Sequence, residues 1–122
     1  MEGLPDEALA QVAAYFQSLS EPTRLQILNL LRRGGRSVGE LARLCGYSSA
    51  NISRHLALLM QQGLVARESR GNSAIYTIAD ESVYALCDLV CDSIARQFEL
   101  RARGHAAFVR PAAKRARQRP TT

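Results

Sequence analysis

Apolar residues recur at helical spacing in five segments of the chain, and a β-like segment lies between the fourth and the fifth. Residues 5–18 begin with a proline and two acids and place their apolar residues on one stripe, which predicts a first helix. The last periodic segment, residues 81–103, predicts the longest helix. The pattern therefore predicts a mainly α fold in the element order ααααββα.

Serines at the starts of the three middle helices and glycines at their ends delimit these segments. Ser20 is the expected N-cap of the second helix, and Ser37 forms a capping box with Glu40 at the start of the third. Ser48 is expected to cap the fourth helix, which runs to about Gln62. Each helix is followed by a glycine, the residue that most often ends a helix.

The β-like segment has the features of a hairpin with a basic tip. Two short runs, residues 64–69 and 73–78, flank the turn sequence Arg70-Gly71-Asn72. The third and fourth helices meet at a glycine, as the two helices of a helix-turn-helix often do. Together these elements predict a winged helix-turn-helix with a two-stranded β-wing.

The positive charge of the chain is concentrated in its middle and at its end. The net charge is +5, and residues 22–79 hold eight arginines against two glutamates. Residues 1–21 hold four acids and no base, whereas residues 105–122 hold five bases and no acid. Such uneven charge is typical of a protein with a nucleic-acid-binding face.

The fourth helix divides into an apolar side and a polar side with small residues. Ile52 and Leu56 share the first side with His55, which we expect to be a hydrogen-bonded core histidine, while Ser53 and Arg54 lie opposite. Small hydroxyl and guanidinium side chains let a helix enter the major groove of double-stranded DNA. The alternative is that this side is only the solvated face of a helical bundle. The candidate DNA-binding residues on this helix and at the wing tip are Ser48, Ser49, Asn51, Ser53, Arg54, Arg70 and Asn72.

At this point the chain resembles the ArsR/SmtB family of winged-helix repressors. The matching stretches are "LSEPTRLQIL" (19–28), "VGELA" (38–42), "ISRHLALL" (52–59), "GLV" (63–65) and "RGNSAIYTI" (70–78). The resemblance covers residues 12 to about 98. It implies a homodimer joined by the first and the fifth helix, which binds an imperfect inverted repeat and is released by an inducer.

The resemblance also implies which ligand sites this chain lacks. The cysteine cluster of the family's arsenic sensors would fall on Ser37, Gly39 and Ala42, none of which is a cysteine. The zinc ligands of the family's last helix would fall on Asp80, Ser82, Ser93 and Arg96, of which only the aspartate suits the metal. Neither of these two sites is therefore expected.

Cys87 and Cys91 remain as candidate ligands. Residues four apart on a helix share one face, so both thiols can turn toward one soft ion. We expect a third thiolate from the partner subunit or from Cys45, and trivalent arsenic or antimony as the inducer. Two alternatives stay open: packing as small apolar residues, and a redox or reactive-sulfur sensor that uses Cys87 and Cys91.

Other features of the sequence set the remaining expectations. Three cysteines and the lack of a long apolar run indicate a cytoplasmic protein without a disulfide framework or a membrane segment. No catalytic constellation is visible, so we expect no enzyme and no required cofactor. Residues 1–104 are expected to form the DNA-binding and dimerisation domain, and residues 105–122 a basic, disordered tail.

Overall fold

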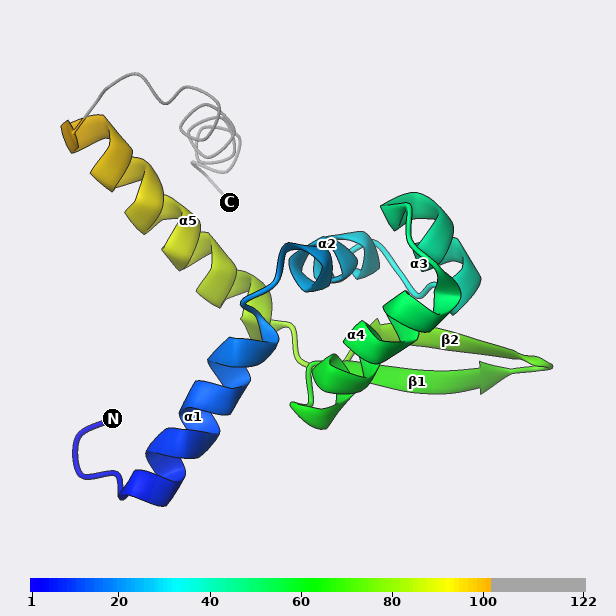
Figure 1. Ribbon diagram of the computed structural model, residues 1–122, viewed down its shortest axis with the longest axis horizontal. Coiled ribbons are helices and arrows are strands. Elements are labelled where there is room, and N and C mark those ends of the chain that lie inside the picture. Colours follow the sequence, from blue (N-terminus) through cyan, green and yellow to red (C-terminus); the bar gives the residue numbers. More distant parts are fainter. Residues whose placement is uncertain (102–122) are drawn as a thin grey trace. The chain divides into compact units, whose positions relative to one another are not determined.

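The computed structural model describes residues 1–101, which form two compact units. The first unit, residues 1–81, contains four helices and a hairpin, and the second contains the long helix that begins at Ser82 (Figure 1). In chain order the elements are α1 (Asp6–Ser18), α2 (Pro22–Leu31), α3 (Val38–Cys45), α4 (Ser49–Gln61), β1 (Val65–Arg70), β2 (Ser73–Ile78) and α5 (Ser82–Arg101). The predicted order ααααββα is confirmed, while the expected tail, 105–122, lies outside the described residues.

The start of α2 differs from the prediction. Glu21, not Ser20, is the N-cap, and its carboxylate accepts a hydrogen bond of 2.6 Å from the backbone N–H of Thr23. The Ser20 hydroxyl instead donates to the carbonyl of Gln17 at the end of α1. The Ser20 hydroxyl therefore satisfies a carbonyl group at the C-terminus of α1. The negative charge of Glu21 lies at the positive end of the α2 dipole.

The other two caps are confirmed. At α3, the Ser37 hydroxyl accepts from the backbone N–H of Glu40, whose carboxylate accepts in turn from the N–H of Ser37. The hydrogen bond from Ser37 lowers the pKa of Glu40, because it stabilises the charged carboxylate. At α4, the Ser48 hydroxyl accepts from the N–H of Asn51 at 3.1 Å. Between the two helices Gly46 has a φ of 77°, which most residues avoid, so the turn of the helix-turn-helix depends on this glycine.

The core of the first unit lies where α2, α3, α4 and the hairpin meet. The fully buried side chains in this unit are aliphatic and come from all of these elements or the residues next to them: Ile27, Leu41, Ile52, Leu56, Leu59 and Leu64. Helix α3 packs on α4, and both α2 and β1 also contact α4. The apolar side of α4 is thus held from three directions, which fixes where its opposite side points.

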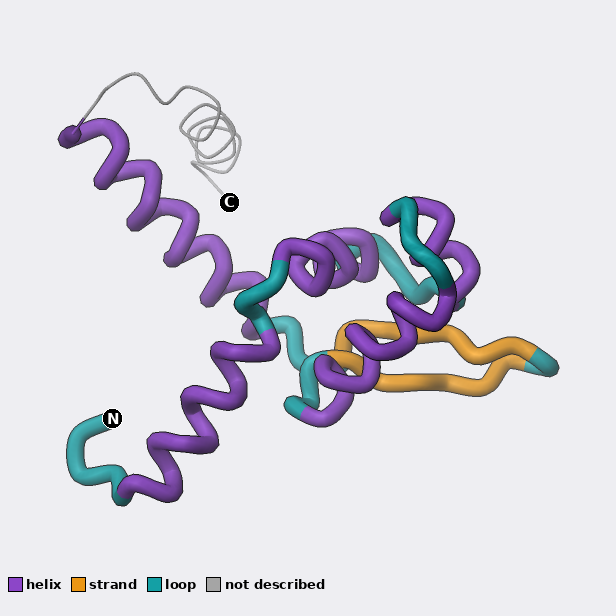
Figure 2. Tube along the Cα trace, viewed as in Figure 1, coloured by secondary structure: helices purple, strands orange, loops and turns teal. Residues whose placement is uncertain are grey.

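The hairpin is antiparallel and projects away from the helices (Figure 2). Val65 pairs with Ile78 at its base and Arg70 with Ser73 at its tip, where Gly71 turns the chain with a φ of 63°. The backbone of Arg36 exchanges two hydrogen bonds with Tyr76, which joins the segment before α3 to the edge of β2. These bonds tie the wing to the helix-turn-helix.

Replacing Gly35 by alanine is expected to lower the free energy of unfolding by about 1–3 kcal/mol, because the new methyl group has no room. An added Cβ would lie 2.5 Å from Cγ2 of Ile75 and 3.0 Å from Cγ2 of Thr77. Gly39→Ala is the matched control, since its nearest atom would be 3.9 Å away and alanine favours the helix. Urea denaturation of both variants checks this; equal stability of the two would contradict it.

Helix α5 leaves several large apolar side chains exposed. Leu89 and Val90 in its middle and Leu100 near its end are all exposed, while Leu86, Ile94 and Phe98 are half-buried. Helix α1 likewise exposes Leu9 and Phe16. No helix within residues 1–101 has both the length and the apolar character to cross a membrane.

Candidate nucleic-acid interface

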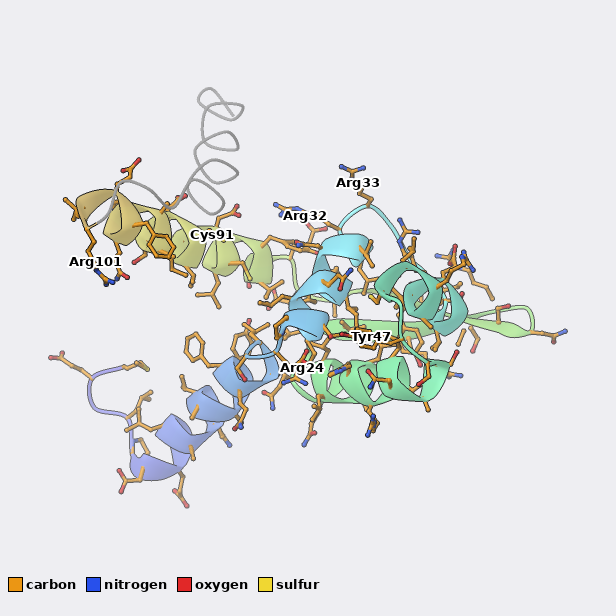
Figure 3. All side chains as sticks on the ribbon, turned by 45° about the horizontal axis from the view of Figure 1, so that its top comes forward. Arg24, Arg32, Arg33, Tyr47, Cys91 and Arg101 are labelled. Carbon is orange, nitrogen blue, oxygen red and sulfur yellow. The ribbon has the colours of Figure 1, made fainter. Side chains whose placement is uncertain are left out.

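Helix α4 presents the predicted side to solvent. Ser49, Ser53 and Arg54 are exposed, whereas Ile52 and Leu56 on the opposite side are fully buried. Figures 1 and 3 show that α4 begins toward the end of the unit to which the hairpin tip extends. The exposed face carries hydroxyl groups and a guanidinium without bulky apolar residues in its first two turns, so it fits a major groove.

Two of the candidate DNA-binding residues at the start of α4 are partly committed to the structure of the protein itself. The Ser48 hydroxyl is exposed and already accepts the capping hydrogen bond from the Asn51 N–H. Asn51 is half-buried, and its Oδ1 is shielded from solvent with no hydrogen-bond partner. Ser48 can still donate its hydroxyl hydrogen to a phosphate while it caps the helix. Asn51 faces outward less than the serines and Arg54 do.

The wing tip carries an ion pair that sequence reasoning missed. Arg70 and Glu68 lie on the same strand, and Nη2 of the arginine is 3.2 Å from Oε1 of the glutamate. Both side chains remain largely exposed, 62% and 53%, so the pair contributes little to stability. Asn72 beside the turn is also exposed. The spacing of two residues along a strand, which places side chains on one face, was the available signal.

Further exposed groups of the first unit were not among the predicted site residues. Tyr47 lies in the turn between α3 and α4 and is half-exposed (Figure 3). Arg43 in the last turn of α3 and Arg67 on β1 are exposed as well. Tyr47 immediately precedes Ser48, the N-cap of α4.

His55 is hydrogen-bonded on the inner side of α4, as predicted. Its Nδ1 lies 3.0 Å from Nη1 of Arg24 in α2. Burial lowers the pKa of His55, because it disfavours the charged imidazolium.

The three cysteines are thiols, and all are half-buried. Cys87 and Cys91 are one turn apart on the continuous helix α5, with Cys91 about halfway along it (Figure 3). Cys45 ends α3 in the other unit, where burial raises the pKa of its thiol. Within residues 1–101, no three His, Cys, Asp or Glu side chains lie close enough together to hold a metal ion.

An exposed polar and basic helix, packed through its other side and followed by a β-wing, defines the class of winged helix-turn-helix DNA-binding regulators. Residues 21–67 match the family described as bacterial regulatory proteins of the arsR family. The chain belongs to this family.

Relatives of known sequence and structure agree with this assignment. The transcriptional regulator NmtR of Mycobacterium tuberculosis is 39% identical over 85 residues, which cover 70% of this chain and 71% of NmtR. The crystal structure of Rv0081 from the same species is 35% identical, with a TM-score of 0.72, and the match covers 80% of this chain and 98% of Rv0081. The solution structure of the homodimeric winged helix-turn-helix DNA-binding domain of Mb0332 from Mycobacterium bovis is 34% identical, with a TM-score of 0.69, over 86% of this chain and all of that domain.

The family and the fold make the protein a transcriptional regulator and not an enzyme, as the sequence predicted. They confirm the resemblance to the ArsR/SmtB family and the winged helix-turn-helix. The individual DNA-contacting residues and the inducer site stay predictions.

Proposed function

We propose that the protein is a homodimeric repressor that binds an imperfect inverted repeat in double-stranded DNA and leaves it when an inducer binds cysteine thiolates. The observation that carries the DNA-binding part is the exposed face of α4, with Ser49, Ser53 and Arg54 opposite a fully buried side. The bases are read by this face, and the wing contacts the flanking phosphates through Arg70 and Asn72.

The start of α4 suits contact with the DNA backbone. Ser48 and Ser49 are exposed at the N-terminus of the helix, where the helix dipole favours negative charge. No acid lies in the first turn of α4 to compete with a phosphate. Ser48 and Ser49 therefore position the helix, and Ser53, Arg54 and Asn51 are the groups proposed to read or flank the base edges.

Dimerisation is supported by the apolar side chains that α1 and α5 expose. Leu9 and Phe16 on α1, and Leu89 and Val90 on α5, would be covered by the same helices of a second copy. The related Mb0332 domain is a homodimer. Two copies of α4 related by a twofold axis would read two half-sites, which accounts for the inverted repeat.

The inducer site is proposed on α5. Cys87 and Cys91 lie at positions i and i+4 of one uninterrupted helix, so their sulfur atoms can bind one thiophilic ion together. Trivalent arsenic or antimony prefers three sulfur ligands, and a cysteine of the partner subunit would supply the third. Cys45 is the weaker candidate, because the raised pKa of its thiol disfavours the thiolate that a ligand must be.

Replacing Arg54 by alanine is expected to weaken specific DNA binding about tenfold, because a good arginine contact to a base edge is worth roughly 1–3 kcal/mol. The test is fluorescence anisotropy with a duplex selected from a random pool by the wild-type protein. Arg96→Ala removes the same charge from α5 and is the matched control. Affinities of the two variants within twofold of each other would refute the proposed face.

A further inference from the structure

Arg24 is the most enclosed charged side chain of the DNA-binding unit. Although it is an arginine, only 8% of its surface is exposed, and its guanidinium makes three hydrogen bonds. Nε donates to the carbonyl of Ser18 at 2.6 Å, and Nη2 donates to the carbonyl of Gln17 at 3.1 Å. Nη1 donates to Nδ1 of His55 at 3.0 Å.

These bonds join three helices through the side chain of Arg24, which is labelled in Figure 3. Gln17 and Ser18 are the last residues of α1, whose carbonyls carry the negative end of the helix dipole. The last turn of α1 contains no basic residue of its own, so Arg24 of α2 supplies the cation there. The third bond reaches His55 on α4, the helix proposed to read the DNA.

The direction of the third bond fixes the protonation of His55. A guanidinium can only donate, so Nδ1 must carry a lone pair, and the imidazole is neutral with its hydrogen on Nε2. Protonation of Nδ1 would remove the acceptor and place a second cation against Arg24. The link is therefore present only while His55 is neutral.

The charged groups that act on His55 come from two places. Glu21, the N-cap of α2, favours the imidazolium, whereas Arg24 of α2 and Arg54 of α4 itself oppose it. Burial has the largest effect, and the net result is a lowered pKa for His55. Since the unfolded chain then takes up a proton more readily than the folded one, stability falls as the pH drops through the ordinary pKa of histidine, about 6.5, toward the lowered value.

We infer that Arg24 and neutral His55 together position α4 for DNA, and that protonation of His55 releases this link and weakens specific binding. The inference rests on the proposed function, because it assigns these residues a part in the same interface. The direction of the change in DNA affinity on acidification distinguishes this inference from a general electrostatic effect. An added positive charge on the protein would strengthen its attraction to phosphates, whereas loss of the link weakens base recognition.

The test is the pH dependence of DNA affinity between about pH 7.5 and 4.5, a range that extends below the ordinary titration of histidine because the pKa of His55 is lowered. For the wild type, affinity for the selected duplex is expected to fall about tenfold as the pH drops, whereas affinity for a random duplex stays level or rises. His55→Asn keeps an acceptor attached to Cγ but does not titrate, so its affinity should change less than twofold. His105→Asn removes the only other histidine and should behave as the wild type does.

Two results would overturn the inference: a wild-type affinity for the selected duplex that rises on acidification, or a His55→Asn variant whose affinity falls with pH as much as that of the wild type. Circular dichroism at each pH confirms that the proteins remain folded. A wild type that binds no duplex at pH 7.5 would refute the proposed function instead. In that case nitrogen NMR of His55 tests the hydrogen bond between Arg24 and His55. A hydrogen on Nδ1 at pH 7.5, or amide signals of α4 that do not shift when His55 titrates, would overturn the inference.

Discussion

Replacing Cys87 and Cys91 together by serine is expected to leave DNA binding within twofold of the wild type and to abolish release by arsenite. Serine keeps the size and a hydroxyl group but lacks the thiolate that binds a soft ion. Neither residue is among the proposed DNA-contacting residues, which all lie between Ser48 and Asn72, so the substitutions remove no proposed DNA contact. The measurement is release of a labelled duplex during titration with arsenite and, separately, with antimonite.

A control variant and a second class of inducer make this experiment more informative. Cys45→Ser is the matched control and should retain most of the response, because the proposed site does not require it. Polysulfide and peroxide, in separate titrations, distinguish a sensor that oxidises or bridges Cys87 and Cys91 from one that binds a metalloid. Retention of the arsenite response in the double variant would eliminate the site on α5, and release by polysulfide alone would identify the redox alternative.

Replacing Leu56 by alanine is expected to remove about 3–5 kcal/mol from the free energy of unfolding, a large part of the stability of a small domain. The side chain is fully buried on the inner side of α4, in the core shared with α2 and α3. Its loss removes apolar contacts and leaves a cavity that the surrounding helices can fill only in part.

Leu58→Ala is the control for this substitution, because Leu58 lies on the same helix with 43% of its surface exposed. It should cost less than about 1 kcal/mol, since little buried surface is lost. Urea denaturation followed by circular dichroism measures both variants. Equal losses would mean that α4 is not held through the side that contains Leu56.

The fold could be predicted because its signals are local. The capping box of Ser37 and Glu40, the cap at Ser48 and the glycine after α3 each act within a few residues, and all were confirmed. The cap of α2 was assigned to the wrong one of two adjacent residues. Serine is the commoner N-cap, but here the hydroxyl of Ser20 donates a hydrogen bond to α1, and the carboxylate of Glu21 caps α2 instead.

The candidate site was predictable only in part, because some of its contacts join distant segments. The helical period placed Ser53 and Arg54 outward and His55 inward, and the structure agrees. It could not show that His55 bonds to Arg24, which lies 31 residues earlier in the chain. Arg24 looked like one more basic residue of a positive segment, although it is buried and unable to contact DNA from its present position.

The pairing of Arg70 with Glu68 affects how DNA binding should respond to salt. An arginine that already has a carboxylate beside it attracts fewer mobile anions from solution and must exchange one acceptor for another when it meets a phosphate. Arg70 then adds less than one unit to the slope of log affinity against log salt concentration, although its side chain carries a full positive charge. We therefore expect the phosphate contact of Arg70 to depend less on salt than that of an arginine with no carboxylate beside it.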